Sequence, residues 1–423
     1  MGILRLVARI MGRISTFRSY QFVLLLAAAL AVVAFYYFGS ERQNFSSTTK
    51  RIKQTQASHN TNRNDADLTV DIGGSHTHGS EEQGGEEQDV GDSEGYRTKK
   101  GDSGAVDQSY HALMMFTKVD KSRSLQDKFR VAMLSMVKHG HFLEGEVLVL
   151  HFVSDQASQA VGERMLDEFL LDATFEYEVL FHDVVALTQK LFPIVEAMQK
   201  HFSAGSGAYY SDAIFFLSVA MHHIMPESLT RIVQLDLDLK YRTNIRDLFQ
   251  EFDRFPPGAV IGIAREMQPV YRGQSEKFHC DPRQEEIYHG DRHTFWQYRK
   301  ENPQTKVGSP PPDGLPGFNS GVMLLDLRAM RASVLYNQLL KPSNVAKLAD
   351  QYRFRGHLGD QDFFTMIGME HPELFYSLAC RWNRQLCTWW RDHGYGDVFQ
   401  LYYRCDGPVY IYHGNCNTPI PDD

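Results

Sequence analysis

The chain of 423 residues is poor in cysteine and has no excess of basic residues. It contains five cysteines, and no two of them form a C-x-x-C pair. Its 44 Lys and Arg residues are outnumbered by 52 Asp and Glu residues, giving a net charge of -8. The charge balance argues against a nucleic-acid-binding protein, and the cysteine spacing disfavours a zinc module.

Aromatic residues are scarce between residues 39 and 109, where Gly, Ser, Thr, Asn, Gln and acidic residues dominate. Such a composition cannot bury enough apolar area to offset the entropy lost on ordering. We therefore predict a disordered stem over 39–109.

Charge is absent from residues 20–38, which as a helix would cover about 28 Å, close to the thickness of a bilayer core. Basic residues precede this stretch and indicate a cytosolic tail over 1–19. The apolar stretch ends without a small-residue cleavage site, which favours an uncleaved signal anchor over a cleaved signal peptide or a buried core helix. The prediction is a single-pass type II membrane protein whose residues after Phe38 lie in the lumen. The short span favours the endoplasmic reticulum membrane, with the Golgi as the alternative.

Residues 110–423 show no internal linker and are rich in apolar residues, which predicts one domain. Strands and helices alternate, which is typical of an α/β fold with a mixed, mainly parallel sheet flanked by helices. The strands expected first are 111–119, 146–153 and 176–181, and the helices are 124–139 and 156–171. A further helix is expected from Ser211, with that serine as its N-cap.

Two aspartates follow the apolar strand that begins at Arg231. Side chains alternate along an extended chain, so Asp236 and Asp238 point the same way. Two carboxylates at a strand end suit a divalent cation such as Mn²⁺ or Mg²⁺, which could hold a diphosphate. A solvated strand end is the competing interpretation.

Three later segments carry further candidate residues. Residues 356–362 (GHLGDQD) precede a helix expected over 363–369, so their polar side chains lie where anions are bound or where a cap is needed. Trp382, Trp389 and Trp390 lie beside amide side chains, as in sugar-binding sites, although at least one of them is expected in the core. A strand over 408–417 ends with His413.

Four cysteines fall in the last part of the chain, in a compartment predicted to be oxidising. Three connectivities are possible, and zinc binding is the alternative. The preferred pairing is Cys380 with Cys405 and Cys387 with Cys416, which would hold the Trp-rich segment against the segment that carries His413. Cys280 would remain free.

The segments LDLD, FNSG, GDQD and the late HG resemble those of the glycogenin-like retaining glycosyltransferases, which have a GT-A (Rossmann-like) fold. Longer segments such as GHLGDQDFFTMIGMEHP and NRQLCTWWRDHGY resemble the xylosyltransferase branch of that family. The resemblance implies retaining, Mn²⁺-dependent transfer of xylose from UDP-α-D-xylose to the terminal xylose of a xylose-glucose disaccharide. That acceptor is O-linked to EGF-like repeats of Notch-type proteins, and the new linkage is α-1,3.

The same resemblance implies roles for individual residues. The metal ligands would be Asp236, Asp238 and His413, with Mg²⁺ as an alternative to Mn²⁺. The donor would be contacted by Met115, Phe116, Thr117, Leu237, Gln361 and Asn415. The acceptor would face Ser320, Leu358 and Trp390. Gln361 and Asp238 would act in catalysis, with Gln361 near the reacting carbon.

The chain departs from these patterns in two places. It lacks the Lys-Pro-Trp ending of the wider family after His413, and residues 272–292, which include Cys280, are additional. The alternatives that remain open are glucosyl or galactosyl transfer, a catalytically silent sugar-binding protein, and a metal-dependent phosphohydrolase. Internal return and double displacement through Asp360 or Asp362 are both open, as is a homodimeric state.

Overall fold

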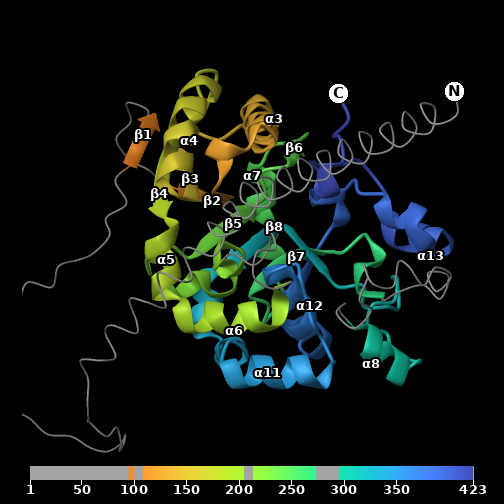
Figure 1. The fold of residues 1–423 in the computed structure, drawn as a ribbon. Coiled ribbons are helices and arrows are strands. Elements are labelled where there is room, and N and C mark those ends of the chain that lie inside the picture. Colours follow the sequence, from red (N-terminus) through yellow and green to blue (C-terminus); the bar gives the residue numbers. More distant parts are fainter. Residues whose placement is uncertain (1–94, 100–107, 204–212, 273–294, 423) are drawn as a thin grey trace, which may run out of the picture. The chain divides into compact units, whose positions relative to one another are not determined.

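The computed structural model describes residues 95–99, 108–203, 213–272 and 295–422. Its central feature is an eight-stranded sheet with the strand order β1-β4-β3-β2-β5-β8-β7-β9 (Figure 1). The strands of this sheet are β1 (Gly95–Lys99), β2 (Gln108–Phe116), β3 (Glu146–Ser154), β4 (Glu176–Asp183), β5 (Arg231–Leu235), β7 (Ile261–Arg265), β8 (Phe318–Asp326) and β9 (Phe375–Leu378).

The pairing of these strands confirms the predicted mixed, mainly parallel sheet. Strands β4, β3, β2 and β5 are parallel to one another, and β9 is parallel to β7. Strand β8 is antiparallel to both β5 and β7. Strand β1 pairs antiparallel with β4, so the sheet includes residues that the sequence analysis assigned to the stem.

Helices cover both faces of the sheet. They are α3 (Arg123–His139), α4 (Gln156–Phe169), α5 (Val184–Lys190), α6 (Phe192–Phe202), α7 (Arg246–Phe249), α8 (Trp296–Glu301), α9 (Leu327–Ala332), α10 (Val334–Leu339), α11 (Pro342–Gln351), α12 (Asp360–Glu370) and α13 (Gly396–Tyr403). Shorter helical turns are η1 (Val119–Lys121), η5 (Gln250–Arg254), η6 (Pro269–Arg272), η8 (Pro372–Leu374), η9 (Cys380–Trp382), η10 (Arg391–Tyr395) and η11 (Asn415–Asn417).

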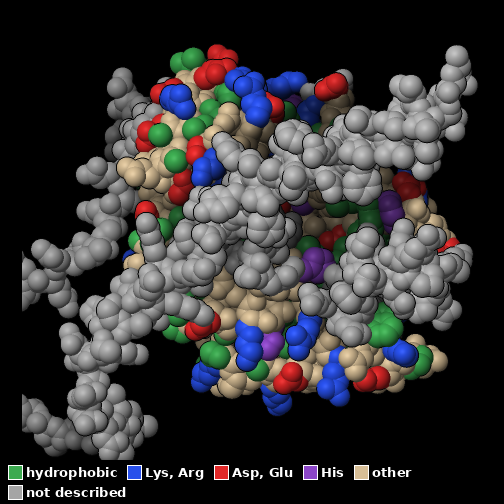
Figure 2. All heavy atoms as spheres, in the orientation of Figure 1, with side chains coloured by type: hydrophobic (Ala, Val, Ile, Leu, Met, Phe, Trp, Pro, Cys, Tyr) green, Lys and Arg blue, Asp and Glu red, His purple; other side chains and the backbone are tan. Residues whose placement is uncertain are grey.

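Two apolar cores follow from the alternation of side chains along the strands. Leu113 of β2 points into the core that contains α6, α11 and α12, whereas Ala112 and Met114 point into the core that contains α3 and α4. Figure 1 shows these two groups of helices on opposite sides of the strands. On the outer surface of α3 and α4, acidic and basic side chains are interspersed (Figure 2), and Arg130 pairs with Glu168 at 2.8 Å between the two helices.

The helix predicted from Ser211 was wrong in type over its described part. Residues from Ala213 form two 3₁₀ segments, η3 (Ala213–Phe216) and η4 (Ser218–His223). The carbonyl of Val219 accepts from the Tyr336 hydroxyl at 2.7 Å, and that of His222 accepts from Arg331 Nε at 3.0 Å. The segment is thus held by tertiary hydrogen bonds that local sequence periodicity does not contain. Ser211 lies outside the described residues.

A second sheet of three strands has the order β10-β11-β6. Its strands are β6 (Leu239–Tyr241), β10 (Arg384–Gln385) and β11 (Ile411–His413). Strand β11 pairs in parallel with β10 and antiparallel with β6. The strand predicted over 408–417 is therefore only three residues long, and the first predicted strand, 111–119, is displaced to Gln108–Phe116.

Two disulfides fix the C-terminal segment with the pairing that the sequence analysis preferred. Cys380 is bonded to Cys405 and Cys387 to Cys416, with Cα–Cα distances of 5.9 and 5.6 Å. Cys380 and Cys405 precede β10 and β11, respectively, whereas Cys387 and Cys416 follow these strands. One bridge therefore lies before this parallel strand pair and the other lies after it.

The predicted cytosolic tail over 1–19, the signal anchor over 20–38, most of the stem over 39–109 and all but Arg272 of the additional segment with Cys280 lie outside the described residues. Among the helices that the structure does describe, none has the length and apolar character needed to cross a membrane.

Candidate active site

Asp236 and Asp238 lie in the short connection between β5 of the large sheet and β6 of the small sheet. The Asp236 backbone N–H donates to the carbonyl of Gly321 in β8 at 2.9 Å. The Asp238 carbonyl accepts from the N–H of Gly414, immediately after β11, at 2.8 Å. The two carboxylates are thus attached to both sheets through the backbone.

His413 meets the two aspartates at this connection, as the sequence predicted. Its Nε2 is 3.3 Å from Asp238 Oδ1 and 3.5 Å from Asp236 Oδ2. One ligand atom from each of the three residues lies within 4.8 Å of the others, and no other such group was found in the part of the chain that the structure describes. Two carboxylate oxygens and one imidazole nitrogen are a donor set that divalent cations such as Mn²⁺ accept. The residues present therefore fit a divalent metal.

The charges of these three side chains depend on one another. Burial alone would lower the pKa of His413, but the carboxylates of Asp238 and Asp236 raise it above its ordinary value. Burial would raise the pKa of Asp238, yet His413 and Lys128 hold it below its usual range. Partial burial and the neighbouring carboxylate raise the pKa of Asp236, whose side chain is still 47% exposed. The raised pKa of Asp236 means that a second negative charge is disfavoured in this cluster, and a bound divalent cation would favour it.

The orientation of the His413 ring is fixed by contacts with Asn383 and Gly321. Its Nδ1 is 2.9 Å from Asn383 Oδ1, and Asn383 Nδ2 donates to Asn319 Oδ1 at 2.8 Å. A Cβ atom at Gly321 would lie 2.4 Å from His413 Cε1, so glycine is required for the ring to pack against β8. The ring can therefore present only Nε2 to the aspartates.

Gln361 lies at the start of α12 and shares a buried carboxylate with Asn319. Gln361 Nε2 and Asn319 Nδ2 each donate to Glu266 Oε2 at 3.2 Å. Glu266 Oε1 accepts from the backbone N–H of Gln268 at 2.9 Å. Burial raises the pKa of Glu266 to about 7.

Both carboxylates at the start of α12 are buried and have their oxygens occupied. Asp360 Oδ1 accepts from Ser320 Oγ at 3.0 Å and its Oδ2 from the Ser218 hydroxyl at 2.5 Å. Asp362 Oδ2 accepts from the N–H groups of His357 and Leu358, and its Oδ1 accepts from Tyr271. Burial raises the pKa of each carboxyl to about 6.

The remaining residues predicted to contact the donor lie near strand ends and differ in their exposure and hydrogen bonding. Met115 and Thr117 are partly exposed at the end of β2, whereas the Phe116 side chain is fully buried in the core, so only its backbone can contact a ligand. Leu237 is partly exposed between the two aspartates. Asn415 uses its Oδ1 to accept from two backbone N–H groups, those of Leu386 and Cys387.

The predicted acceptor residues are brought close to the same region only in part. The Ser320 backbone N–H donates to Gln361 Oε1 at 3.3 Å. Leu358 is partly exposed just before α12, and Trp390 is partly exposed and packs edge-on against Tyr395. Of the other two tryptophans, Trp382 is buried, as expected for at least one, and Trp389 is 42% exposed.

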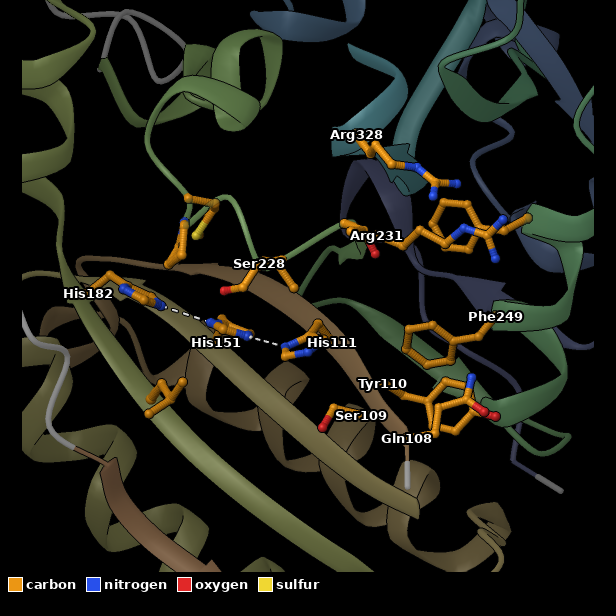
Figure 3. Close-up of a pocket in the computed structure, with 16 residues that line it drawn as sticks. Gln108, Ser109, Tyr110, His111, His151, His182, Ser228, Arg231, Phe249 and Arg328 are labelled. Carbon is orange, nitrogen blue, oxygen red and sulfur yellow. Dashed lines mark hydrogen bonds between the residues drawn. The ribbon is translucent and has the colours of Figure 1, made fainter. Parts of the chain in front are cut away.

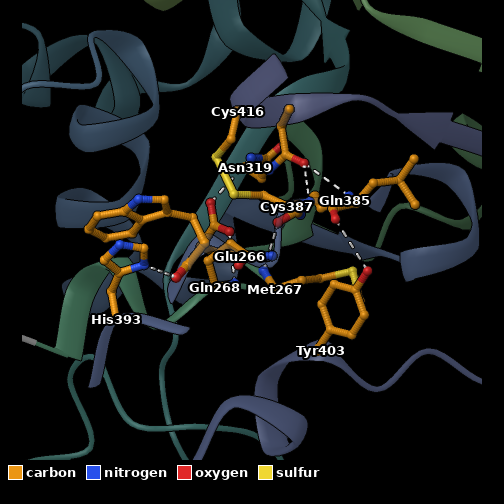
Figure 4. Close-up of a disulfide and its surroundings, with 12 residues drawn as sticks. Glu266, Met267, Gln268, Asn319, Gln385, Cys387, His393, Tyr403 and Cys416 are labelled. Carbon is orange, nitrogen blue, oxygen red and sulfur yellow. Dashed lines mark hydrogen bonds between the residues drawn. A yellow bond between two sulfur atoms is a disulfide. The ribbon is translucent and has the colours of Figure 1, made fainter. Parts of the chain in front are cut away.

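The Cys387–Cys416 disulfide lies beside the Glu266 network (Figure 4). Gln385 of β10 connects the two, because its Oε1 accepts from the Met267 N–H at 2.8 Å. The disulfide therefore stabilises the β10–β11 pair, which positions Asn383 and His413.

Sequence reasoning missed three residues of this site. Lys128 of α3 places its Nζ 3.4 Å from Asp238 Oδ2 and 2.8 Å from Asn417 Oδ1. Asn383 and Glu266 connect His413 and Gln361 indirectly. Asn383 lies in the segment NRQLCTWWRDHGY, but nothing in that segment marks it as a partner of His413. Only the fold brings the three residues to the aspartates, across separations as long as 110 residues for Lys128.

A separate pocket of about 820 Å³ lies at the amino ends of β2 and β5 and includes none of the predicted site residues. A row of hydrogen-bonded imidazoles runs along it (Figure 3). His111 Nδ1 is 2.9 Å from His151 Nε2, and His151 Nδ1 is 2.9 Å from His182 Nε2. Burial lowers the pKa of His111 and of His182 to about 4, and that of His151 well below its ordinary value.

Comparisons with known proteins give the family. No family model matches the chain. Xyloside xylosyltransferase 1 of Mus musculus is 58% identical over 428 residues, which cover 100% of both chains. The Homo sapiens protein of that name is 58% identical over 430 residues, again over 100% of both chains. The chain belongs to the xyloside xylosyltransferase family. It is therefore a glycosyltransferase.

The solved structures agree with this membership. The crystal structure of mouse xyloside xylosyltransferase 1 in its apo form has a TM-score of 0.67 and 66% identity to this chain. The similarity covers 74% of this chain and 100% of that one. The fold is thus that of the GT-A glycosyltransferases, as the sequence motifs predicted, and family membership implies a nucleotide-sugar donor and a glycan acceptor.

Proposed function

We propose that this xylosyltransferase transfers xylose from UDP-α-D-xylose, with Mn²⁺ bound and with retention of configuration. The acceptor is the terminal xylose of a xylose-glucose disaccharide O-linked to EGF-like repeats of Notch-type proteins, and the linkage formed is α-1,3. The observation that carries the proposal is the Asp236, Asp238 and His413 cluster, which is joined by hydrogen bonds to Gln361 in a chain of this family.

A bound divalent cation would supply positive charge where negative charge develops on the departing UDP. Asp236, Asp238 and His413 are the residues that would hold it. For the donor we assign Met115, Phe116, Thr117, Leu237, Gln361 and Asn415. For the acceptor we assign Ser320, Leu358 and Trp390.

The surroundings of Asp360 and Asp362 support internal return over double displacement. A covalent intermediate requires a carboxylate oxygen that is free to attack the anomeric carbon. Both side chains are buried, and Asp362 Oδ2 accepts from two backbone N–H groups that cannot turn away, which occupies both of its lone pairs. The acceptor hydroxyl would instead attack on the face that UDP leaves, with a phosphate oxygen of UDP as the proton acceptor.

We further propose that the enzyme is a single-pass type II protein of the endoplasmic reticulum membrane with its catalytic domain in the lumen. The charge-free stretch over 20–38, the basic residues before it and the paired cysteines support this location. Protease protection of the C-terminal domain in intact microsomes, lost on adding detergent, is the expected result.

The function is tested with the detergent-solubilised full chain and an EGF-like repeat that carries xylose-glucose. UDP-xylose, UDP-glucose and UDP-galactose are compared with and without Mn²⁺. We expect Mn²⁺-dependent transfer of xylose, lost in Asp238→Asn. Transfer of a hexose would overturn the donor assignment, and binding of UDP-sugars without any transfer would favour a sugar-binding protein.

The role of Gln361 is tested separately. Gln361→Ala should lower turnover without abolishing it, because an amide near the reacting carbon stabilises charge but forms no bond. Complete loss together with a trapped glycosyl-enzyme, detected by mass spectrometry of the intact protein, would contradict internal return.

A further inference from the structure

A chain of hydrogen bonds runs from Glu266 to His413 through two buried amides. Glu266 Oε2 accepts from Asn319 Nδ2, and Asn319 Oδ1 accepts from Asn383 Nδ2. Asn383 Oδ1 then faces His413 Nδ1. Glu266, Asn319, Asn383 and His413 are each less than 9% exposed, so water does not compete for these groups.

The direction of every bond in this chain is determined by groups that have only one role. The backbone N–H of Gly321 can only donate, so Asn319 must turn its Oδ1 to this group, which lies 3.2 Å away, and its Nδ2 to Glu266, which accepts in its ionised form. Asn383 must then donate to Asn319 and accept from His413. The proton of neutral His413 is thereby held on Nδ1, and the lone pair of Nε2 faces the aspartates.

The same carboxylate sets the orientation of Gln361. Gln361 Nε2 donates to Glu266 Oε2, which leaves Gln361 Oε1 to accept from the Ser320 N–H. One buried acid therefore determines how both a predicted metal ligand and the amide assigned near the reacting carbon are presented. Neither contact with substrate nor binding of metal is required of Glu266 itself.

We propose that Glu266 is a positioning residue that fixes the metal-binding tautomer of His413, through Asn319 and Asn383, and the orientation of the Gln361 amide. The inference rests on the proposed function for the identity of the ligands, but the network itself is a property of the protein without substrate. Metal affinity and tautomer are therefore measured independently of sugar transfer.

The first variant is Glu266→Gln, which preserves volume and the acceptor for the Gln268 N–H but presents an amide donor to Asn319 and Gln361. We expect Mn²⁺ affinity, measured by calorimetry on the full-length protein, to fall about tenfold, as for other partners of metal-binding histidines. In ¹⁵N spectra, His413 should change from the Nδ1–H form to a mixture of tautomers. Turnover should fall, with little change in the KM for the acceptor.

A second pair of variants tests the other end of the chain. Asn383→Leu removes the acceptor for His413 and should lower Mn²⁺ affinity by a similar factor. Asn383→Asp keeps that acceptor and should restore most of the affinity. The losses in Glu266→Gln and Asn383→Leu should not add when the two are combined, because both act through His413.

Asn337→Leu is the matched control, because Asn337 Oδ1 makes the same kind of contact with His222 Nε2, at 3.0 Å, away from the site. It should leave Mn²⁺ affinity unchanged. The proposal is overturned if Glu266→Gln or Asn383→Leu binds Mn²⁺ within twofold of the wild type, or if Asn337→Leu shows the same loss. If the variants change Mn²⁺ affinity as expected but the enzyme uses a donor other than UDP-xylose, only the proposed donor is refuted.

Discussion

Two groups of buried histidines in this protein are shifted in opposite directions. His413 has its pKa raised because Asp238 and Asp236 face it. The row of His111, His151 and His182 has its pKa values lowered mainly by burial, with smaller contributions from the two flanking imidazoles at His151 and from Lys190 at His182. Burial acts on all four rings, but only one of them meets carboxylates.

The comparison separates the effect of burial from the effect of partners. A buried imidazole with imidazole partners stays neutral and contributes to the fold as a small polar ring. The same ring beside two carboxylates becomes part of a charged cluster that a divalent cation can complete. The chemistry of the site therefore resides in the surroundings of the histidine and not in the residue type.

The largest expected effect concerns the neutral row and pH. The folded protein keeps His111 and His182 neutral down to about pH 4, whereas the unfolded chain protonates them near pH 6.5. The unfolded state thus binds more protons in this window, and stability falls as pH decreases from 6.5 towards 4. Each of the two residues accounts for about 3 kcal/mol of this loss.

The variant His182→Asn should remove its share of the acid sensitivity. Urea unfolding at neutral and at acidic pH measures the difference, and the exposed residue His141, changed to Asn, is the control. An unchanged loss of stability in His182→Asn would mean that the row does not stay neutral in the fold.

The next largest effect is a loss of xylose transfer in a variant that disturbs the metal site but leaves Asp236, Asp238 and His413 unchanged. In Gly321→Ala the new Cβ would lie 2.4 Å from His413 Cε1, so the ring must move away from the aspartates. Xylose transfer should fall about 100-fold, as for other displacements near 1 Å in active sites. The pH dependence of stability that the histidine row causes should remain.

Gly396→Ala is the matched control, since its nearest contact would be 3.3 Å and its environment is exposed. Equal activity of Gly321→Ala and Gly396→Ala in a Mn²⁺-dependent assay would contradict the importance of His413 packing.

The smallest expected effect is a change in Mn²⁺ affinity when the positive charge of Lys128 is removed. Lys128 pairs with Asp238 and so competes with a cation for that carboxylate. Lys128→Met should raise Mn²⁺ affinity by up to about fivefold, the worth of a partly exposed ion pair. Calorimetry on the substrate-free protein measures it, with Lys138→Met on the same helix as the control. A decrease in affinity would show that Lys128 supports the metal site.

Much of this architecture follows from local sequence patterns. The alternation of strands and helices predicted the mixed sheet, and the i, i+2 spacing placed Asp236 and Asp238 on one side of the chain. The bounds of α3 and β3 were predicted to within one residue, because capping and apolar periodicity determine them locally. The Ser122 hydroxyl caps α3, for example, by accepting from the Leu125 N–H.

Other features depend on contacts that no local pattern contains. In the two 3₁₀ turns at 213–223, for example, the carbonyls of Val219 and His222 accept hydrogen bonds from Tyr336 and Arg331, which are distant in sequence. Glu266 and Asn383 become part of the site only when β7, β8 and β10 are assembled. Asn383 opens the segment NRQLCTWWRDHGY, but this segment does not indicate a contact with His413. The roles of both residues come from donor and acceptor geometry in the fold.

The two disulfides cross in sequence, because Cys387 lies between Cys380 and Cys405 whereas its partner Cys416 lies beyond them. Any cut between residues 388 and 404 therefore falls inside both loops. The exposed turn at Arg391 is such a place for a protease. A chain cleaved there would migrate as one molecule until a reductant is added, and the fragment that carries His413 would stay covalently tied to the rest of the enzyme.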